Sequence, residues 1–178
     1  SSVNWGENQE KVDFQTIYKN RFKVLRKAYT NFDLTDKSYL DFCDKNTYWL
    51  DDFALYMTLK DSFDGKPWNE WEKVLKTRKS TVIEKVKKEL KNEIEFQKFI
   101  QYEFFVQWSN LKKYANENGI LIIGDIPIYV AGDSADVWAN PKNFLLDEDC
   151  NPIEVAGCPP DAFTEDGEFN QILVNSVF

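Results

Sequence analysis

The stretch that decides the fold is residues 119–163, which read GILIIGDIPIYVAGDSADVWANPKNFLLDEDCNPIEVAGCPPDAF. It begins with Ile120-Leu121-Ile122-Ile123, an unbroken apolar run. A strand with one solvated face alternates apolar and polar residues, so this run predicts a strand buried on both faces, as in a parallel sheet. Asp125 follows directly, and α/β folds place their chemistry at the carboxyl ends of such strands. The stretch therefore predicts an α/β protein with an acidic residue at the tip of an interior strand.

A long helical pattern leads into this stretch. It runs from Thr81 to Asn118, begins with a capping box, and ends at Asn118-Gly119, which is typical of a helix stop. The first half is rich in charge and is expected to face solvent. The second half, 96–114, is rich in aromatic residues and is predicted to be buried. A break in the helix is expected near Asn92.

Three further helices are predicted upstream. Apolar residues step by three and four over 12–32, which predicts a helix with one buried stripe. A short helix over 36–43 is capped by Thr35 or Asp36. A third begins at Asn46 or Thr47 and ends at Asp64-Gly65.

A tryptophan pair follows the third helix. Pro67 suits the first position of a new helical turn, and Trp68 and Trp71 lie on that turn. The pair can stack on a sugar ring or pack one helix against another. Packing is the favoured interpretation.

Shorter elements are expected after Val130. Asp133 is a candidate cap for a short helix through Trp138, which Asn140-Pro141 would end. Apolar runs at 144–146 and 153–155 flank a polar turn and predict a hairpin. The proline-rich loop 157–163 is expected to be stiff, and serves either to present side chains to a ligand or as a plain connector.

Composition excludes several classes of function. The 178 residues suffice for one domain, and the net charge of −8 argues against nucleic acids and anionic membrane surfaces as partners. No apolar run approaches the roughly 18 residues of a membrane span, and no signal-peptide pattern is present, so the expected location is cytoplasmic.

The chain has no histidine, which excludes His-assisted nucleophilic catalysis and His-ligated zinc. Cys43, Cys150 and Cys158 lack metal-ligand spacing and are expected to be reduced thiols. The acidic turn 147–149 lacks the ligand spacing of an EF-hand. We therefore predict no metal and no cofactor, so the chemistry depends on carboxylates, hydroxyls, lysines or aromatic surfaces.

Several long motifs resemble one family. They are GDIPIYVAGDSADVW (124–138), NPxxFLLDEDxNP (140–152), AGxPPDxF (156–163), YWLDDFALYMTLKDSFDGKPWNEW (48–71) and EIEFQKFIQYEFFVQW (93–108). Over 12–167 the chain resembles the amylomaltases, the 4-α-glucanotransferases of the α-amylase clan. The resemblance implies a (β/α)8 TIM barrel with a mostly helical inserted subdomain, acting on α-1,4-glucans. It also implies a covalent glycosyl-enzyme intermediate on an aspartate, with a glutamate as acid/base.

The resemblance also implies the site residues. Asp125 matches an aspartate that ends the third barrel strand and helps hold the sugar, and Pro127 lies beside it in the same motif. Asp161 and Phe163 match a loop over the acceptor side, although Ala162 stands where tyrosine is usual. Judged without the family, Asp125, Asp133, Asp136 and Asp161 are the candidate carboxylates, and caps or solvated surface acids are the plain alternative for all except Asp125.

The family pattern is incomplete in this chain. No segment matches the motifs of the nucleophile, the acid/base or the third carboxylate, so no catalytic residue is assigned. Glu168 to Leu173 stand where the family continues with a different motif, and a complete barrel needs about 250 residues. We expect a loose segment (1–11), a helical subdomain (12–118), a barrel strand with its loop, short helix and hairpin (119–167), and an atypical tail (168–178). The chain is thus expected to be an inactive fragment of a glucanotransferase, and the alternative is a non-catalytic module that binds glucan or a protein.

Overall fold

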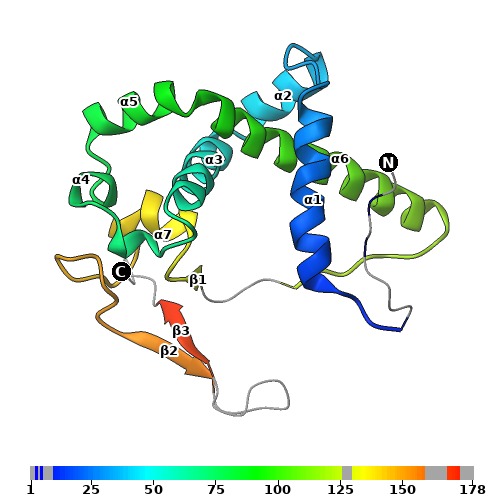
Figure 1. Cartoon of the computed structure of the whole chain (residues 1–178). Helices are drawn as coiled ribbons and strands as arrows, with labels where there is room; N and C mark the ends of the chain where they lie inside the picture. Colours follow the sequence, from blue (N-terminus) through cyan, green and yellow to red (C-terminus); the bar gives the residue numbers. More distant parts are fainter. Residues whose placement is uncertain (1–2, 4, 6–9, 126–129, 159–167, 173–178) are drawn as a thin grey trace.

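Most of the described chain is helical. The computed structural model describes residues 3, 5, 10–125, 130–158 and 168–172 (Figure 1). The helices are α1 (Phe14–Tyr29), α2 (Lys37–Lys45), α3 (Thr47–Ser62), α4 (Lys73–Lys76), α5 (Ser80–Glu89), α6 (Lys91–Glu117) and α7 (Ala135–Ala139), with short 3₁₀ turns η1 (Trp68–Glu70) and η2 (Pro141–Asn143). The strands are β1 (Val130–Ala131), β2 (Val155–Cys158) and β3 (Glu168–Ile172).

Local signals place several helix ends well, but the capping box predicted at Thr81 is wrong, because α5 begins at Ser80 and has no side-chain cap. The predicted cap Asp36 accepts hydrogen bonds from the backbone N–H groups of Ser38 (2.9 Å) and Tyr39 (3.0 Å) at the start of α2. After α3, Asp64 and Gly65 adopt left-handed φ angles of 53° and 78°, as the predicted stop requires. The expected break in the long helix is confirmed at Leu90, between α5 and α6.

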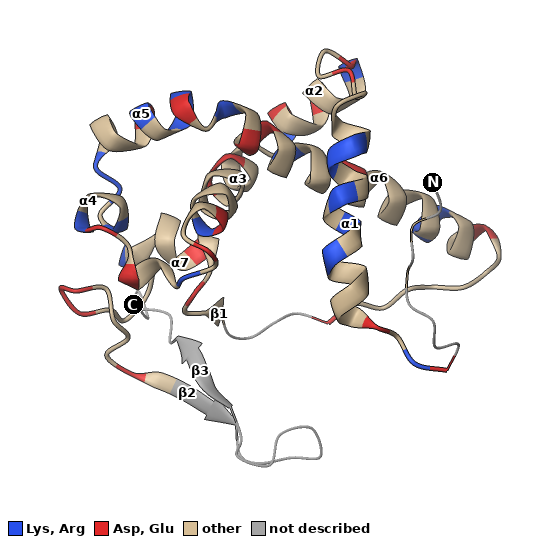
Figure 2. Cartoon of the chain, viewed as in Figure 1, with Lys and Arg blue, Asp and Glu red and all other residues tan. Residues whose placement is uncertain are grey.

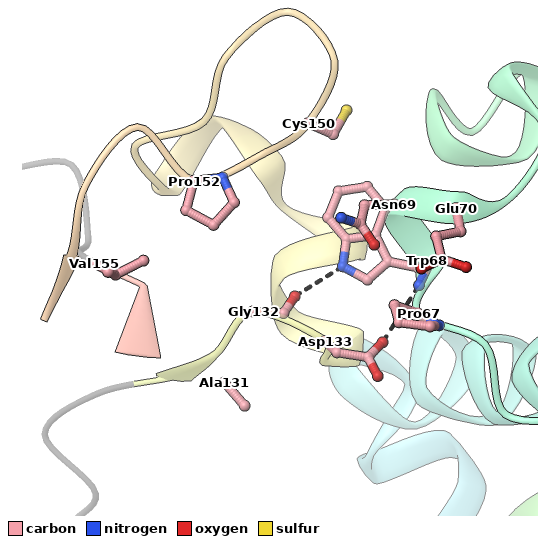
Figure 3. Close-up of a pocket in the computed structure, with 10 residues that line it drawn as sticks. All are labelled: Pro67, Trp68, Asn69, Glu70, Ala131, Gly132, Asp133, Cys150, Pro152 and Val155. Carbon is pink, nitrogen blue, oxygen red and sulfur yellow. Dashed lines mark hydrogen bonds between the residues drawn. The ribbon is translucent and has the colours of Figure 1, made fainter. Parts of the chain in front are cut away.

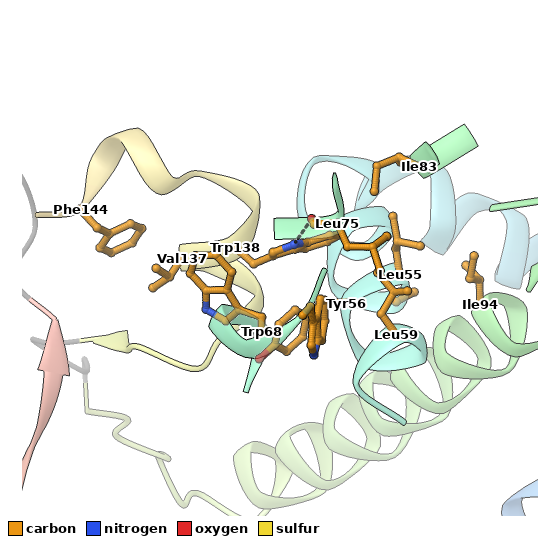
Figure 4. Close-up of a cluster of buried hydrophobic side chains, with 12 residues drawn as sticks. Leu55, Tyr56, Leu59, Trp68, Leu75, Ile83, Ile94, Val137, Trp138 and Phe144 are labelled. Atoms are coloured by element: carbon orange, nitrogen blue, oxygen red, sulfur yellow. Dashed lines mark hydrogen bonds between the residues drawn. The ribbon is translucent and has the colours of Figure 1, made fainter. Parts of the chain in front are cut away.

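The main hydrophobic core joins α3, α4, α5, α6 and α7 (Figure 4). Trp138 is fully buried in it, and its indole N–H donates to the Leu75 carbonyl at 3.0 Å. The guanidinium of Arg78 lies 4.2 Å from the centre of the Trp138 ring. Trp68 and Trp71 are also buried here, which confirms the packing interpretation of that pair.

A second cluster holds α1 against α6. Tyr29, Phe96 and Phe99 are buried together, and Arg26 pairs with Glu93 while its guanidinium lies 3.5 Å from the centre of the Phe96 ring. The first half of α1 is different, because Phe14 and Tyr18 are exposed and Ile17 is only half-buried. The predicted buried stripe is therefore correct only for the C-terminal half of this helix.

The second half of α6 also departs from the prediction. Figure 1 shows it extending beyond α1. Phe104, Trp108, Leu111 and Tyr114 are exposed, although the aromatic pattern predicts burial. The second half of α6 does carry these apolar side chains, but the described elements that pack on α6 do not cover them.

The predicted interior strand is not formed. Ile120, Leu121, Ile122 and Ile123 are 60 %, 82 %, 38 % and 93 % exposed and have no strand structure. The described strands pair only with one another, antiparallel and in the order β1-β3-β2. The prediction of a doubly buried strand is wrong for this chain, because an apolar run becomes a strand only where neighbours can pair with it. The described residues accordingly show a helical fold with a small antiparallel sheet and no barrel.

The region after α7 is partly as predicted. Leu146 pairs with Pro152, and the Ile153 N–H donates to the Leu145 carbonyl at 2.9 Å, which closes the expected turn. Val155 instead joins β2, which pairs with β3 in the segment expected to be a tail. Ser134, and not Asp133, caps α7.

Candidate functional site

A cavity of about 470 Å³ lies where the helical region meets the segments around β1 and β2 (Figure 3). Its lining comes from three parts of the chain that are distant in sequence, namely Pro67, Trp68, Asn69 and Glu70, then Ala131, Gly132 and Asp133, then Cys150, Pro152 and Val155. The cavity is thus formed by tertiary packing and not by one loop.

Trp68 forms the link between two of these parts. Pro67 precedes η1 in an extended conformation with φ −56° and ψ 143°, and the indole of Trp68, the next residue, is buried. The indole N–H donates to the Gly132 carbonyl at 2.8 Å, as Figure 3 shows. This bond fixes the chain after β1 against the helical region.

Asp133 is the second link. Its carboxylate accepts from the Tyr56 hydroxyl at 2.6 Å and from the backbone N–H of Trp68 at 3.3 Å, and it forms an ion pair with Lys60. Burial on its own would raise the pKa of Asp133, but the hydrogen bonds from Lys60 and Tyr56 outweigh it and hold that pKa below its ordinary value. Burial, followed by the hydrogen bond to Asp133, raises the pKa of Tyr56. Asp133 is therefore an ionised structural link and not a free nucleophile.

The rim of the cavity combines polar and apolar groups. The Asn69 amide donates to the Asn151 side-chain oxygen at 3.3 Å, and the exposed carboxylate of Glu70 is next to it in sequence. Pro67 and Pro152 supply apolar surface. Carboxylate and amide oxygens accept hydrogen bonds from hydroxyl groups, while flat apolar surface suits the face of a ring. The rim can therefore bind a polyhydroxylated ring compound.

The site residues expected from the sequence do not gather at this cavity. Asp125 is exposed and is not among the residues that line the cavity. Pro127, Asp161 and Phe163 lie outside the described residues. The structure instead places Asn69 and Glu70 in the lining of the cavity. Both follow Trp68 in the PWNEW motif, and this motif is the sequence signal that could have indicated them as site residues.

No metal site is evident in the part of the chain that the structure describes, since no three His, Cys, Asp or Glu side chains gather there. Within the same residues, no helix combines the length and the apolar character needed to cross a bilayer.

Comparison with known proteins identifies similar sequences. A family model described as 4-alpha-glucanotransferase matches residues 2–169. The 4-alpha-glucanotransferase of Clostridium butyricum is 52 % identical over 167 residues, which cover 93 % of this chain and 34 % of that protein. That of Thermus thermophilus is 40 % identical over 168 residues, covering 92 % of this chain and again 34 % of the relative. The chain thus spans about a third of the length of the curated relatives it matches.

A solved structure has the same arrangement. Amylomaltase from Streptococcus agalactiae, in complex with acarbose, matches with a TM-score of 0.87 and 37 % sequence identity. The match covers 97 % of this chain and 36 % of that chain.

Proposed function

The chain belongs to the 4-alpha-glucanotransferase family, and we propose that it forms the helical part of an enzyme that transfers α-1,4-glucan segments between maltodextrins. The observation that carries the proposal is the family match over residues 2–169. The likeness to an amylomaltase in complex with acarbose supports a saccharide ligand.

The proposed reaction is a double displacement that retains configuration. Such a reaction uses a carboxylate nucleophile and a carboxylic acid/base about 5–5.5 Å apart. Asp133 does not suit the role of nucleophile, because its carboxylate already accepts from Tyr56, Lys60 and Trp68. The motifs that carry the catalytic carboxylates in this family are not found in this chain, so we propose that the chain alone is inactive. The rest of the enzyme would supply these groups.

In the intact enzyme we propose that Ile120–Ile123 form a strand of a (β/α)8 barrel, with Asp125 at its carboxyl end facing the substrate. Pro127, Asp161 and Phe163 are proposed to lie at the same substrate site. The free thiols Cys43 and Cys150 are consistent with a reducing, cytoplasmic compartment, which we also propose.

We further propose that the cavity beside Trp68 holds a glucose unit of the glucan. Its volume of about 470 Å³ exceeds the roughly 300 Å³ at the lower limit of small-molecule sites. The Glu70 carboxylate and the Asn69 amide would bond sugar hydroxyls, and the two prolines would contact the apolar face of the ring.

Calorimetric titration with maltoheptaose tests this assignment. We expect weak, saturable binding in the millimolar range, and the double substitution Asn69→Ala with Glu70→Gln is expected to weaken it at least tenfold. Each lost hydrogen bond to a charged acceptor is worth about 1.5–3 kcal/mol, and one such loss suffices for that change.

The matched control is Glu117→Gln, which neutralises an exposed carboxylate at the end of α6, far along the chain from the cavity. It should leave the binding unchanged. Equal binding by the double variant would show that glucan does not enter this cavity, and absence of heat at millimolar maltoheptaose would contradict glucan binding by this chain.

A further inference from the structure

A second cavity, of about 260 Å³, lies between α3, the end of α5 and the start of α6. Among the described residues, none lines both this cavity and the one beside Trp68. Its lining combines three lysines, two carboxylates and two aliphatic side chains. Lys91, Glu95 and Lys98 are spaced by four and three residues, so they share one face of α6. The cavity is therefore a built feature of the packing between α3 and α6, with both charged and apolar walls.

The segment that borders this cavity is basic, although the whole chain is acidic. Residues 73–91 contain eight Lys and Arg against two Glu, which gives this segment a net charge of +6 in a chain whose net charge is −8. Figure 2 shows the basic residues of α4 and α5. A local excess of one sign of charge raises the concentration of oppositely charged ligands near it. The cavity is thus placed where small anions are attracted.

The two carboxylates of the cavity are held in place by neighbouring groups. Lys98 has a side chain that is only 17 % exposed, and its ammonium nitrogen lies 2.5 Å from an Asp51 carboxylate oxygen. The Glu95 carboxylate accepts a hydrogen bond from the hydroxyl of the buried Tyr39 at 2.9 Å. A carboxylate has two oxygens and about four lone pairs, so each can also accept a hydrogen bond from a ligand hydroxyl. The wall of the cavity therefore offers two positioned acceptors.

The other two lysines of the cavity are at its mouth. Lys91, the first residue of α6, is exposed. Lys87 is also exposed, and its ammonium lies 3.2 Å from the Glu84 carboxylate in a surface ion pair, which contributes little to stability. Lysine binds phosphate as a point charge, so two such lysines can bind one phosphate group. The buried side chains of Leu55 and Ile94 add apolar surface that suits the face of a ring.

We propose that this cavity is a binding site for a phosphorylated hexose. The phosphate lies between Lys87 and Lys91, and the ring hydroxyls donate to the carboxylates of Asp51 and Glu95. The volume is just below the roughly 300 Å³ at which sites for drug-sized ligands begin, so the cavity suits one substituted ring and not a glucan chain. The proposal stands apart from the proposed function, because it uses only side chains of α3, α5 and α6.

Calorimetric titration of this chain with glucose 1-phosphate tests the proposal, with glucose and inorganic phosphate as separate ligands. We expect saturable binding of glucose 1-phosphate. Glucose and inorganic phosphate should each bind at least tenfold more weakly, because each makes only part of the contacts. Raising the NaCl concentration from about 0.05 M to about 0.5 M should weaken the binding of glucose 1-phosphate severalfold, since salt screens exposed charges.

The double variant Lys87→Gln with Lys91→Gln tests the phosphate contacts. Both side chains are exposed, so the thermal midpoint without ligand should hardly change, whereas the affinity for glucose 1-phosphate should fall at least tenfold. The matched control is Lys85→Gln with Lys113→Gln, which removes two exposed lysines that also form ion pairs along a helix but do not line the cavity. The control should leave the affinity for glucose 1-phosphate unchanged.

A second variant separates this cavity from the one beside Trp68. Asn69→Ala with Glu70→Gln changes only the first cavity, so it should weaken the binding of maltoheptaose and retain that of glucose 1-phosphate. The lysine variant should show the reverse. The proposed function and the present proposal can therefore fail independently of each other.

Three results would overturn the proposal. Absence of heat at about 10 mM glucose 1-phosphate would mean that the cavity binds no such ligand. Inorganic phosphate that binds as tightly as glucose 1-phosphate would show a general anion site that does not recognise the sugar. Unchanged affinity in the lysine variant, together with a loss in the Asn69 and Glu70 variant, would place the sugar phosphate in the cavity beside Trp68.

Discussion

Replacing Trp138 with alanine is expected to lower the free energy of unfolding by about 3–5 kcal/mol, the usual range for truncating a buried tryptophan. The side chain is fully buried, its ring packs against Tyr56 and Trp71, and its N–H satisfies the Leu75 carbonyl. Alanine would leave a cavity between α3 and α7, and the Leu75 carbonyl would lose the indole donor while keeping its bond from the Arg78 backbone N–H. Urea unfolding followed by circular dichroism measures the change.

Trp138→Phe separates the two contributions. It keeps an aromatic ring in the core but removes the indole donor to the Leu75 carbonyl, which still accepts from the Arg78 backbone N–H, so the expected loss is about 0.5–1.5 kcal/mol. Tyr48→Ala, at an exposed position of α3, is the control and should change the stability by no more than about 0.5 kcal/mol. A loss below about 1 kcal/mol for Trp138→Ala would mean that α7 is not an integral part of the core.

Asp133→Asn is expected to destabilise the protein by about 1–2 kcal/mol at pH 7, because it removes the ion pair with Lys60 and leaves only a neutral acceptor for Tyr56. Burial opposes ionisation of Asp133, but the bonds from Lys60 and Tyr56 prevail and lower its pKa in the folded state. A lowered pKa stabilises the folded state fully above the unfolded value, and this contribution is lost as the pH falls through the folded value. The difference between wild type and variant should therefore stay constant from pH 7 to about pH 5 and shrink below about pH 4.

Urea unfolding at pH 7, 5, 4 and 3 measures this difference for both proteins. Other aspartates whose pKa is lowered, including Asp36 and Asp147, are common to both and cancel in the difference. Asp136→Asn, in the first turn of α7, is the nearby control and should shift stability by at most about 0.5 kcal/mol. A difference that grows toward acid pH would contradict the assignment of Asp133 as an ionised link.

Local chemistry made part of the fold predictable. Asp36 at the start of α2, the left-handed pair Asp64-Gly65 after α3 and the break at Leu90 all depend on residues within one or two turns. The burial of Trp68 and Trp71 was also predictable, since large aromatic residues on an amphipathic turn most often pack. These features need no knowledge of what lies elsewhere in the chain.

The errors occurred where burial depends on distant partners. Ile120–Ile123 have the composition of an interior strand, but no described strand lies beside them, and the pattern cannot report whether neighbours are present. The prediction that the second half of α6 is buried was wrong for the same reason. The pairing of β3 with β1 and β2 was missed because Glu168–Ile172 carry no alternation that would reveal a central strand.

The candidate site was predictable only in part. The sequence makes Asp133 a candidate cap and a candidate carboxylate, but its role depends on three donors on α3 and η1 that are more than sixty positions away in the sequence. Asn69 and Glu70 belong to the PWNEW motif, which the sequence shows. Their position at a cavity depends on where the turn after Asp147 packs, and the motif does not contain that information. Such contacts between remote segments are decided by tertiary packing.

Disproportionation of maltotriose tests the central claim most directly. Release of glucose and of longer maltodextrins is followed for this chain alone and for a chimera in which this chain replaces the matching region of the Clostridium butyricum relative. We expect no turnover above the buffer rate from the chain alone and measurable turnover from the chimera, because we propose that the catalytic carboxylates come from the rest of the enzyme. Turnover by the chain alone would contradict the account, as would a folded chimera that releases no glucose.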